Sequence, residues 1–315
     1  MYRSKRFKAL AAPLVLLAAT SAAHAETSLD ASFRFGIQFT DDDQDSADLG
    51  VFTDESKIRL NHSSQINDSL SAIAKLELEI EPDNITDNSS GFGRTREAWV
   101  GVKSSFGRIT VGTQYTSFYD TVSGVTDIAL TASCLSQQRC DEDDNVLKYS
   151  GESGSIKYTS SARLAESDDG TDIADELELG ASFGTGPISF GVATSFRASE
   201  GNQSSGFLIG GVASTSLDNG LELGLGLQVA DSDFTGSGDT STQVTFSGAY
   251  GSFYTVLNLA DGLVDDAGSY GTVGYTHQLS DNALLYFEGL IFDGNDDLGT
   301  LFGLLAAFKY DFDIL

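Results

Sequence analysis

The segment Asn61-His62-Ser63-Ser64 brings together residue types that suit nucleophilic hydrolysis. That chemistry needs a hydroxyl next to a histidine, with a third polar group to orient the ring. The surrounding sequence is typical of an extended strand, in which adjacent residues point to opposite faces of the sheet. Proximity in sequence therefore builds no catalytic triad, and a membrane hydrolase remains only an enzyme-class alternative.

Acidic residues are the other candidates for chemistry, and they gather in three short clusters. The clusters read TDDDQDSAD at 40–48, DEDDN at 141–145 and AESDDGTDIADE at 165–176. Blocks of like charge usually form solvated loops. The more specific alternative is that these clusters bind divalent cations. The whole chain has 46 acidic and 18 basic residues, which excludes nucleic acid as a partner because such proteins need a basic surface.

The first 25 residues are typical of a secretory signal peptide. Four basic residues precede the apolar core LAAPLVLLAA, which is too short to span a bilayer, and Ala23-His24-Ala25 offers a cleavage site. A membrane anchor is the alternative. Cleavage would leave residues 26–315, and because four basic and no acidic residues are lost, the net charge would fall from −28 to −32.

Cys134 and Cys140 are the only cysteines, and they lie in one predicted loop of an exported chain. An oxidising compartment favours a disulfide between them. Since no histidine lies beside them, we expect no zinc site. Apart from divalent cations as the alternative for the acidic clusters, we expect no metal or cofactor.

The elements that position these residues show the two-residue period of β-strands. In Leu29–Thr40, Phe33, Phe35, Ile37 and Phe39 alternate with polar or small residues. Arg34 and Arg59 each stand between two apolar residues, so alternation alone places both on the polar face of a strand. Past residue 25 no apolar run is long enough for a transmembrane helix.

Short turns alternate along the chain with longer acidic or glycine-rich loops. Such turns are NDS at 67–69, SSFG at 104–107, GTGP at 184–187, DNG at 218–220 and SDN at 280–282. Short turns at one end and long loops at the other are typical of outer-membrane β-barrels, whose apolar faces meet lipid and whose polar faces line water. We therefore predict an all-β, transmembrane antiparallel β-barrel of about 16 strands.

The stretch Arg96–Tyr115 fits two such strands joined by SSFG, although imperfectly. By strict alternation Arg96 faces the lumen and Trp99 faces outward. Glu97 shares the parity of Trp99, so it would also face outward unless a subunit contact or the membrane interface covers it.

The sequence also resembles the general diffusion porins of Gram-negative bacteria. The segment REAWVGVKSSFGRITVGTQYTSFYD resembles the family's fourth and fifth strands, DNVLKYS at 144–150 resembles the strand after its third loop, and LFGLLAAFKYDF at 301–312 resembles its closing strand. The resemblance implies a homotrimer of sixteen-stranded barrels in the bacterial outer membrane. In each barrel the third loop, here about residues 115–143, folds into the lumen as a constriction.

The resemblance also implies which residues narrow the pore. Arg34, Arg59 and Arg96 match the family's basic wall, and between Tyr115 and Asp144 six acids face Arg139 alone. Of these acids we prefer Asp120 and Asp127 as lumenal. Glu142 stands near a position that is basic in some relatives, so the basic wall should be weaker here. The chain also continues past Phe312 with Asp313-Ile314-Leu315, where the family usually ends on the aromatic residue.

The expected function is passive diffusion of small hydrophilic solutes and ions, with a preference for cations. A solute-selective channel is the nearest alternative, but a sugar channel should carry a ladder of lumenal aromatics, and most aromatics here fall in the outward register. A secreted structural β-protein is a further alternative, which the resemblance of the closing strand disfavours.

Overall fold

Segments of alternating polarity form β-strands throughout the part of the chain that the computed structural model describes. These residues are 25–42, 47–53, 55–80, 92–130, 134, 139–165, 173–199, 205–235, 239–261, 268–293 and 300–315. The predicted signal peptide lies outside these ranges except for Ala25, as do parts of the acidic clusters at 40–48 and 165–176. Among the described residues, no helix has the length and hydrophobicity that a membrane-crossing helix needs.

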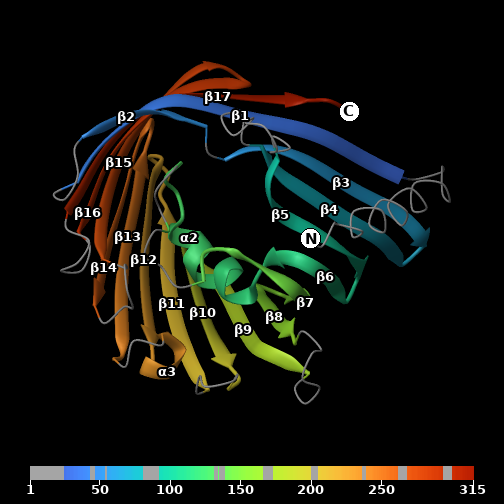
Figure 1. Cartoon of the computed structure of the whole chain (residues 1–315). Coiled ribbons are helices and arrows are strands. Elements are labelled where there is room, and N and C mark those ends of the chain that lie inside the picture. The colour runs from blue at the N-terminus through green and yellow to red at the C-terminus, as the bar shows by residue number, and fades with distance from the viewer. Residues whose placement is uncertain are drawn as a thin grey trace, which may run out of the picture.

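The described residues form seventeen strand segments and three short helical segments (Figure 1). The strands are β1 (Ala25–Asp42), β2 (Asp48–Phe52), β3 (Ser56–Asn67), β4 (Leu70–Ile80), β5 (Phe92–Ser104), β6 (Gly107–Tyr115), β7 (Glu142–Ser153), β8 (Ile156–Leu164), β9 (Ala174–Thr185), β10 (Ile188–Arg197), β11 (Gly206–Ser216), β12 (Leu221–Ala230), β13 (Ser241–Tyr250), β14 (Phe253–Asp261), β15 (Ser269–Ser280), β16 (Ala283–Asp293) and β17 (Thr300–Asp313). The helical segments are η1 (Tyr119–Ser123), α2 (Gly124–Thr126) and α3 (Ser232–Thr235).

The sheet closes into a barrel because β1 pairs with β17 as well as with the strands that follow it. Both β2 and β3 pair with β1: β2 opposite residues 36–40, and β3 opposite residues 25–32. The two segments therefore occupy one strand position of the barrel. The described residues thus form a closed antiparallel barrel of 16 strand positions, which confirms the prediction.

The two ends of the barrel differ in the length of their connections. The strand boundaries leave two residues between β3 and β4, between β5 and β6 and between β13 and β14, but 26 residues, 116–141, between β6 and β7. The C-terminal residues lie at the short-turn end, where the backbone N–H groups of Ile314 and Leu315 both donate to Leu29 O. The tail after Phe312 therefore continues the pairing with β1.

The outer face of the barrel is apolar and the inner face is polar, the reverse of a water-soluble fold. On β9, Leu177 and Leu179 are about half exposed, whereas Glu176 and Glu178 are 2% exposed. The closing strand β17 likewise exposes Phe302, Leu304, Phe308 and Tyr310. An apolar outer band around a polar lumen is the arrangement that a lipid bilayer stabilises.

A β-bulge in β5 corrects one prediction. Glu77 pairs with Glu97 but Leu78 pairs with Thr95, so Arg96 is the extra residue between them. A bulge of this kind places two consecutive side chains on one face and re-aims the strand that follows. Trp99 therefore faces the lumen, where its Nε1 donates to Glu97 Oε2 at 2.9 Å. The predicted outward orientation of Trp99 was wrong, and the bulge also explains the misfit of Glu97.

Candidate functional site

The third loop folds into the lumen (Figure 1). Glycines on the inner wall give it room. A Cβ atom at Gly180 or Gly191 would overlap atoms of Thr121 in η1, and one at Gly210 would overlap the ring of Phe118. Phe118 and Val122 complete a buried apolar cluster with residues of β10–β12 and α3. The first half of the loop thus packs directly on the wall formed by β9, β10 and β11.

The close approach at Gly191 provides a test of this docking. We expect Gly191→Ala to displace η1, because the added methyl would meet the backbone oxygen of Thr121, which cannot rotate away. Gly211→Ala is the matched control, since Gly211 lies on the neighbouring strand and a Cβ there meets no atom closer than 3.8 Å. Single-channel recording should show altered conductance for Gly191→Ala only. Equal behaviour of the two variants would contradict the docking.

The tip of the loop is held on the opposite wall by Leu130. Its backbone N–H donates to Glu288 Oε1 at 2.7 Å, and its carbonyl accepts from Arg34 Nη1 at 2.5 Å. Glu288 also accepts from Tyr254 Oη at 2.6 Å, and the Leu130 side chain packs against a buried cluster that includes Phe52 and Tyr286. The loop therefore crosses the lumen from β9–β11 to β1 and β16.

The returning half of the loop is held by Arg139. Its guanidinium contacts Glu176, Glu178 at 3.0 Å and Asp143 at 3.0 Å. Burial disfavours the charge of Arg139, but the three carboxylates outweigh it and raise the pKa of the guanidinium above its ordinary value. Glu178 Oε2 also accepts the backbone N–H of Phe118 at 2.7 Å. One buried cluster thus fastens both halves of the loop to β9.

An outer cavity of about 540 Å³ opens between this loop and the wall on the long-loop side. Arg34, Arg96 and Asp127 all line it, so the structure brings together three of the predicted residues. Asp127 accepts from the Tyr119 hydroxyl at 2.8 Å. Burial and the neighbouring Asp127 carboxylate raise the pKa of Tyr119, which keeps the hydroxyl protonated as a donor.

The other predicted residues lie elsewhere. Glu142, whose side chain is only 3% exposed, is not among the residues that line the outer cavity, and it accepts from Arg96 Nε at 2.9 Å. Arg59 lies outside the outer cavity and pairs with Asp30 at 2.6 Å. Asp120 pairs with Lys148 at 2.5 Å and lines the other side of the loop.

The disulfide joins Cys134 and Cys140, as predicted. Both cysteines line the outer cavity, so the bridge lies at the constriction itself.

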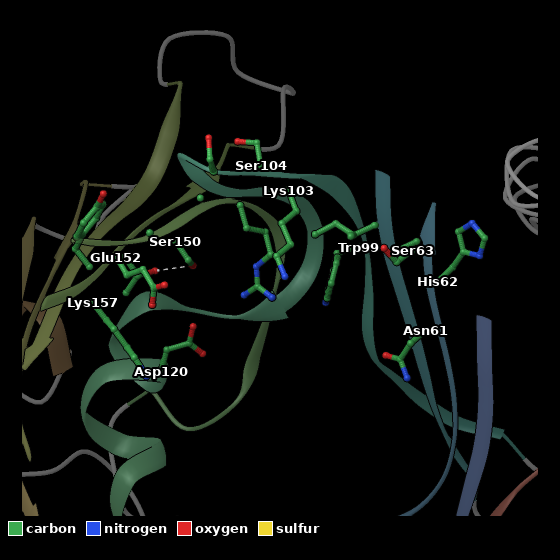
Figure 2. A pocket seen from close by; sticks show the side chains of 18 of the residues that line it. Asn61, His62, Ser63, Trp99, Lys103, Ser104, Asp120, Ser150, Glu152 and Lys157 are labelled. Atoms are coloured by element: carbon green, nitrogen blue, oxygen red, sulfur yellow. Dashed lines mark hydrogen bonds between the residues drawn. The ribbon is translucent and has the colours of Figure 1, made fainter. Parts of the chain in front are cut away.

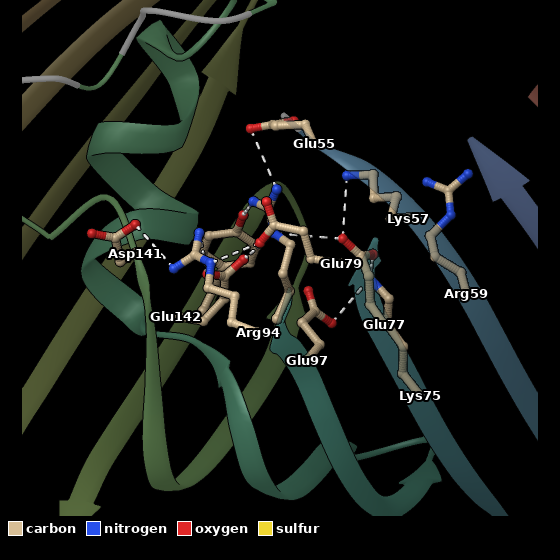
Figure 3. Close-up of polar contacts among 12 residues, drawn as sticks. Glu55, Lys57, Arg59, Lys75, Glu77, Glu79, Arg94, Glu97, Asp141 and Glu142 are labelled. Atoms are coloured by element: carbon tan, nitrogen blue, oxygen red, sulfur yellow. Dashed lines mark hydrogen bonds and ion pairs between the residues drawn. The ribbon is translucent and has the colours of Figure 1, made fainter. Parts of the chain in front are cut away.

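The bases of the outer cavity are neutralised by carboxylates on the same wall (Figure 3). Arg34 pairs with Glu55 at 3.2 Å, and Lys57 pairs with Glu77 at 3.2 Å. Four bases line the cavity: Arg34, Lys57, Arg94 and Arg96. Six acids either line the cavity or contact one of these bases: Glu55, Glu77, Glu79, Asp127, Asp141 and Glu142. The local charge is therefore net negative, although the wall is rich in arginine.

Of these six acids, Glu55, Glu77 and Glu79 were not predicted from the sequence. Glu77 and Glu79 alternate with apolar residues on β4, as Glu176 and Glu178 do on β9, and this alternation is the signal that could have identified them as lumenal. The prediction of the constriction rested on the arginines and on the third loop alone.

An inner cavity of about 1020 Å³ lies on the other side of the loop, towards the short turns (Figure 2). It is lined by Trp99, Lys103, Arg108, Asp120 and Lys157, among others. The aperture between the two cavities is therefore bordered by charged and hydrogen-bonding groups. Such a polar aperture penalises apolar solutes, because they must displace ordered water.

Within the described residues, no three or more His, Cys, Asp or Glu side chains are placed to hold a metal ion. His62 Nδ1 lies 2.8 Å from Thr27 Oγ1 on the adjoining strand.

Comparisons with known proteins agree on a family. A family model described as "Gram-negative porin" matches residues 9–297. The chain is 28% identical over 183 residues to "Porin-like protein H" of Photobacterium profundum, a match that covers 54% of this chain and 53% of that protein. The chain thus spans about half the length of the curated relative it matches.

Solved structures share the fold at low sequence identity. The anion-selective porin from Comamonas acidovorans is 17% identical with a TM-score of 0.71, covering 92% of this chain and 100% of that one. OmpF of Salmonella typhi in complex with daunomycin is 14% identical with a TM-score of 0.70, covering 91% and 97%. A trimer form of OmpT of Vibrio cholerae is 14% identical with a TM-score of 0.63, covering 92% and 100%.

Proposed function

The chain belongs to the Gram-negative porin family and is a multi-pass β-barrel protein of the outer membrane, and from this premise we propose that it is a passive diffusion channel that prefers cations. Small hydrophilic solutes and ions would pass through the lumen beside the third loop. The wall arginines and lysines orient solutes and water, while the excess of carboxylates sets the sign of the preference.

The observation that carries the cation preference is the pairing of the wall bases. Each of the four bases that line the outer cavity lies within 4.0 Å of at least one carboxylate. A paired guanidinium presents little net positive potential to a passing ion, whereas Asp127 and the surplus acids attract cations. The Comamonas relative is described as anion-selective, so selectivity has to be measured for this chain.

We further propose a homotrimer, in line with the trimer form of the Vibrio relative. The exposed apolar side chains of the outer face provide surface both for outer-membrane lipid and for subunit contacts. We propose no enzymatic activity, because the family and fold are those of channels and His62 has Thr27, not an acid, as its partner.

Purified protein in planar bilayers tests this function. We expect stepwise current increases that come in groups of three per insertion, together with passage of small polar solutes in a liposome-swelling assay. The absence of any conductance from correctly folded protein would overturn the channel proposal, and single steps only would overturn the trimer.

A further inference from the structure

Three basic side chains in the described part of the chain differ from the others in having no acidic partner. Of the fourteen Lys and Arg residues there, eleven lie within 4.0 Å of a carboxylate. The other three are Lys103, Arg108 and Lys157, and all three line the inner cavity. In a chain with a large excess of acid, three bases without an acidic partner are thus grouped at one site.

Two of these bases also stand directly opposite each other. Lys103 on β5 pairs in register with Arg108 on β6, and like charges in that position repel each other. The Arg108 guanidinium lies 5.6 Å from the centre of the Trp99 ring. Stacking of this kind occupies one face of the guanidinium and leaves the N–H groups at its edge free to donate.

The acids of the inner cavity do not neutralise this pair. Asp120 is already paired with Lys148. Glu152 stands opposite Lys157 in the β7–β8 register, and among the described contacts it forms no ion pair with that lysine. Glu26, at the start of β1, is exposed and forms no ion pair with any described residue. Lys103 projects into the cavity beside Trp99 in Figure 2.

We propose that the inner cavity binds a small multivalent oxyanion, of the phosphate or phosphate-ester class, between Lys103 and Arg108. The guanidinium edge offers a planar fork that suits two oxygens of one phosphate group, and the lysine adds a point charge on the adjoining strand. Lys157 lines the same cavity, with Glu152 opposite it on β7. The anion enters from the short-turn end, because the acids of the outer cavity repel it at the other end. The site thus binds anions in a pore that otherwise favours cations. This contrast rests on the cation preference proposed above.

Equilibrium dialysis of the detergent-solubilised protein against labelled inorganic phosphate tests the site without requiring conduction. We expect Lys103→Gln and Arg108→Gln each to raise the dissociation constant for phosphate about tenfold, the loss of one charge-assisted contact. Lys309→Gln is the matched control, since Lys309 also faces inward but pairs with Asp311 at 2.8 Å and lines neither cavity. Circular dichroism confirms that each variant is folded.

The result that would overturn the proposal is equal phosphate binding by the wild type and the Lys103 and Arg108 variants, or no phosphate binding at all. A second dialysis experiment adds chloride at matched ionic strength. We expect phosphate to bind in its presence, and complete displacement by chloride would show only general screening and would also refute the site. A barrel that conducts ions but fails this dialysis test would leave the channel function intact.

Discussion

Arg139→Gln should release the returning half of the third loop and increase both the single-channel conductance and the current noise. The substitution leaves Glu176 and Glu178 without their closest cationic partner, and both side chains are at most 2% exposed. Removing one member of such a buried ion pair costs about 3–5 kcal/mol, because the remaining charge stays desolvated. We expect the loss to destabilise the docked position of the third loop, while the interstrand hydrogen bonds of the barrel remain.

Arg139→Lys is the matched variant for this prediction, since it keeps the charge but cannot contact three carboxylates as the guanidinium does. We expect its conductance to lie between those of the wild type and Arg139→Gln. If Arg139→Gln were indistinguishable from the wild type in conductance and noise, the buried cluster would not hold the loop.

Arg96→Gln should shift the zero-current potential further towards cations while the barrel remains folded. Arg96 pairs with Glu142 at 2.9 Å and Glu55 at 3.3 Å, and its Nη2 donates to the Tyr115 hydroxyl at 2.7 Å. Its loss adds one uncompensated negative charge beside the outer cavity. A lumenal change of this kind alters selectivity, whereas a charge on the lipid face would cost stability.

The double variant Arg96→Gln/Glu142→Gln restores the charge balance and separates charge from shape. We expect its selectivity to return close to that of the wild type, which makes the two substitutions strongly non-additive. A double variant as cation-selective as Arg96→Gln alone would show that side-chain size, not charge, causes the shift.

Much of the fold could be predicted because a two-residue period and turn lengths are local properties of the chain. The alternation at Phe33–Phe39 and the short turns at 67–69 and 280–282 indicated the barrel, its strand number and its lipid-facing side, and the structure confirms each of them. Parity fails only where a single inserted residue shifts it. The bulge at Arg96 is such a place, and it reversed the predicted orientation of Trp99.

The site was harder to predict, because parity gives the face of the sheet but not the depth along the barrel. Arg34 and Arg96 lie at the level of the third loop, whereas Arg59, on the same inner face, lies beside Asp30 away from both cavities. Asp120 and Asp127 lie in the same loop segment but face opposite sides of it. Arg139 lies in the third loop and Glu176 on β9, so their contact depends on how the loop folds back into the lumen.

The central claim is that paired wall bases and surplus carboxylates make the pore prefer cations. The zero-current potential of the wild-type protein across a potassium chloride gradient, measured at several mean salt concentrations, tests it most directly. Charges of the loops beyond the aperture are screened over about 8 Å at about 0.15 M salt, whereas those in the aperture act at every concentration. We therefore predict a cation preference that declines as ionic strength rises but does not reverse. An anion preference at every concentration would contradict the account.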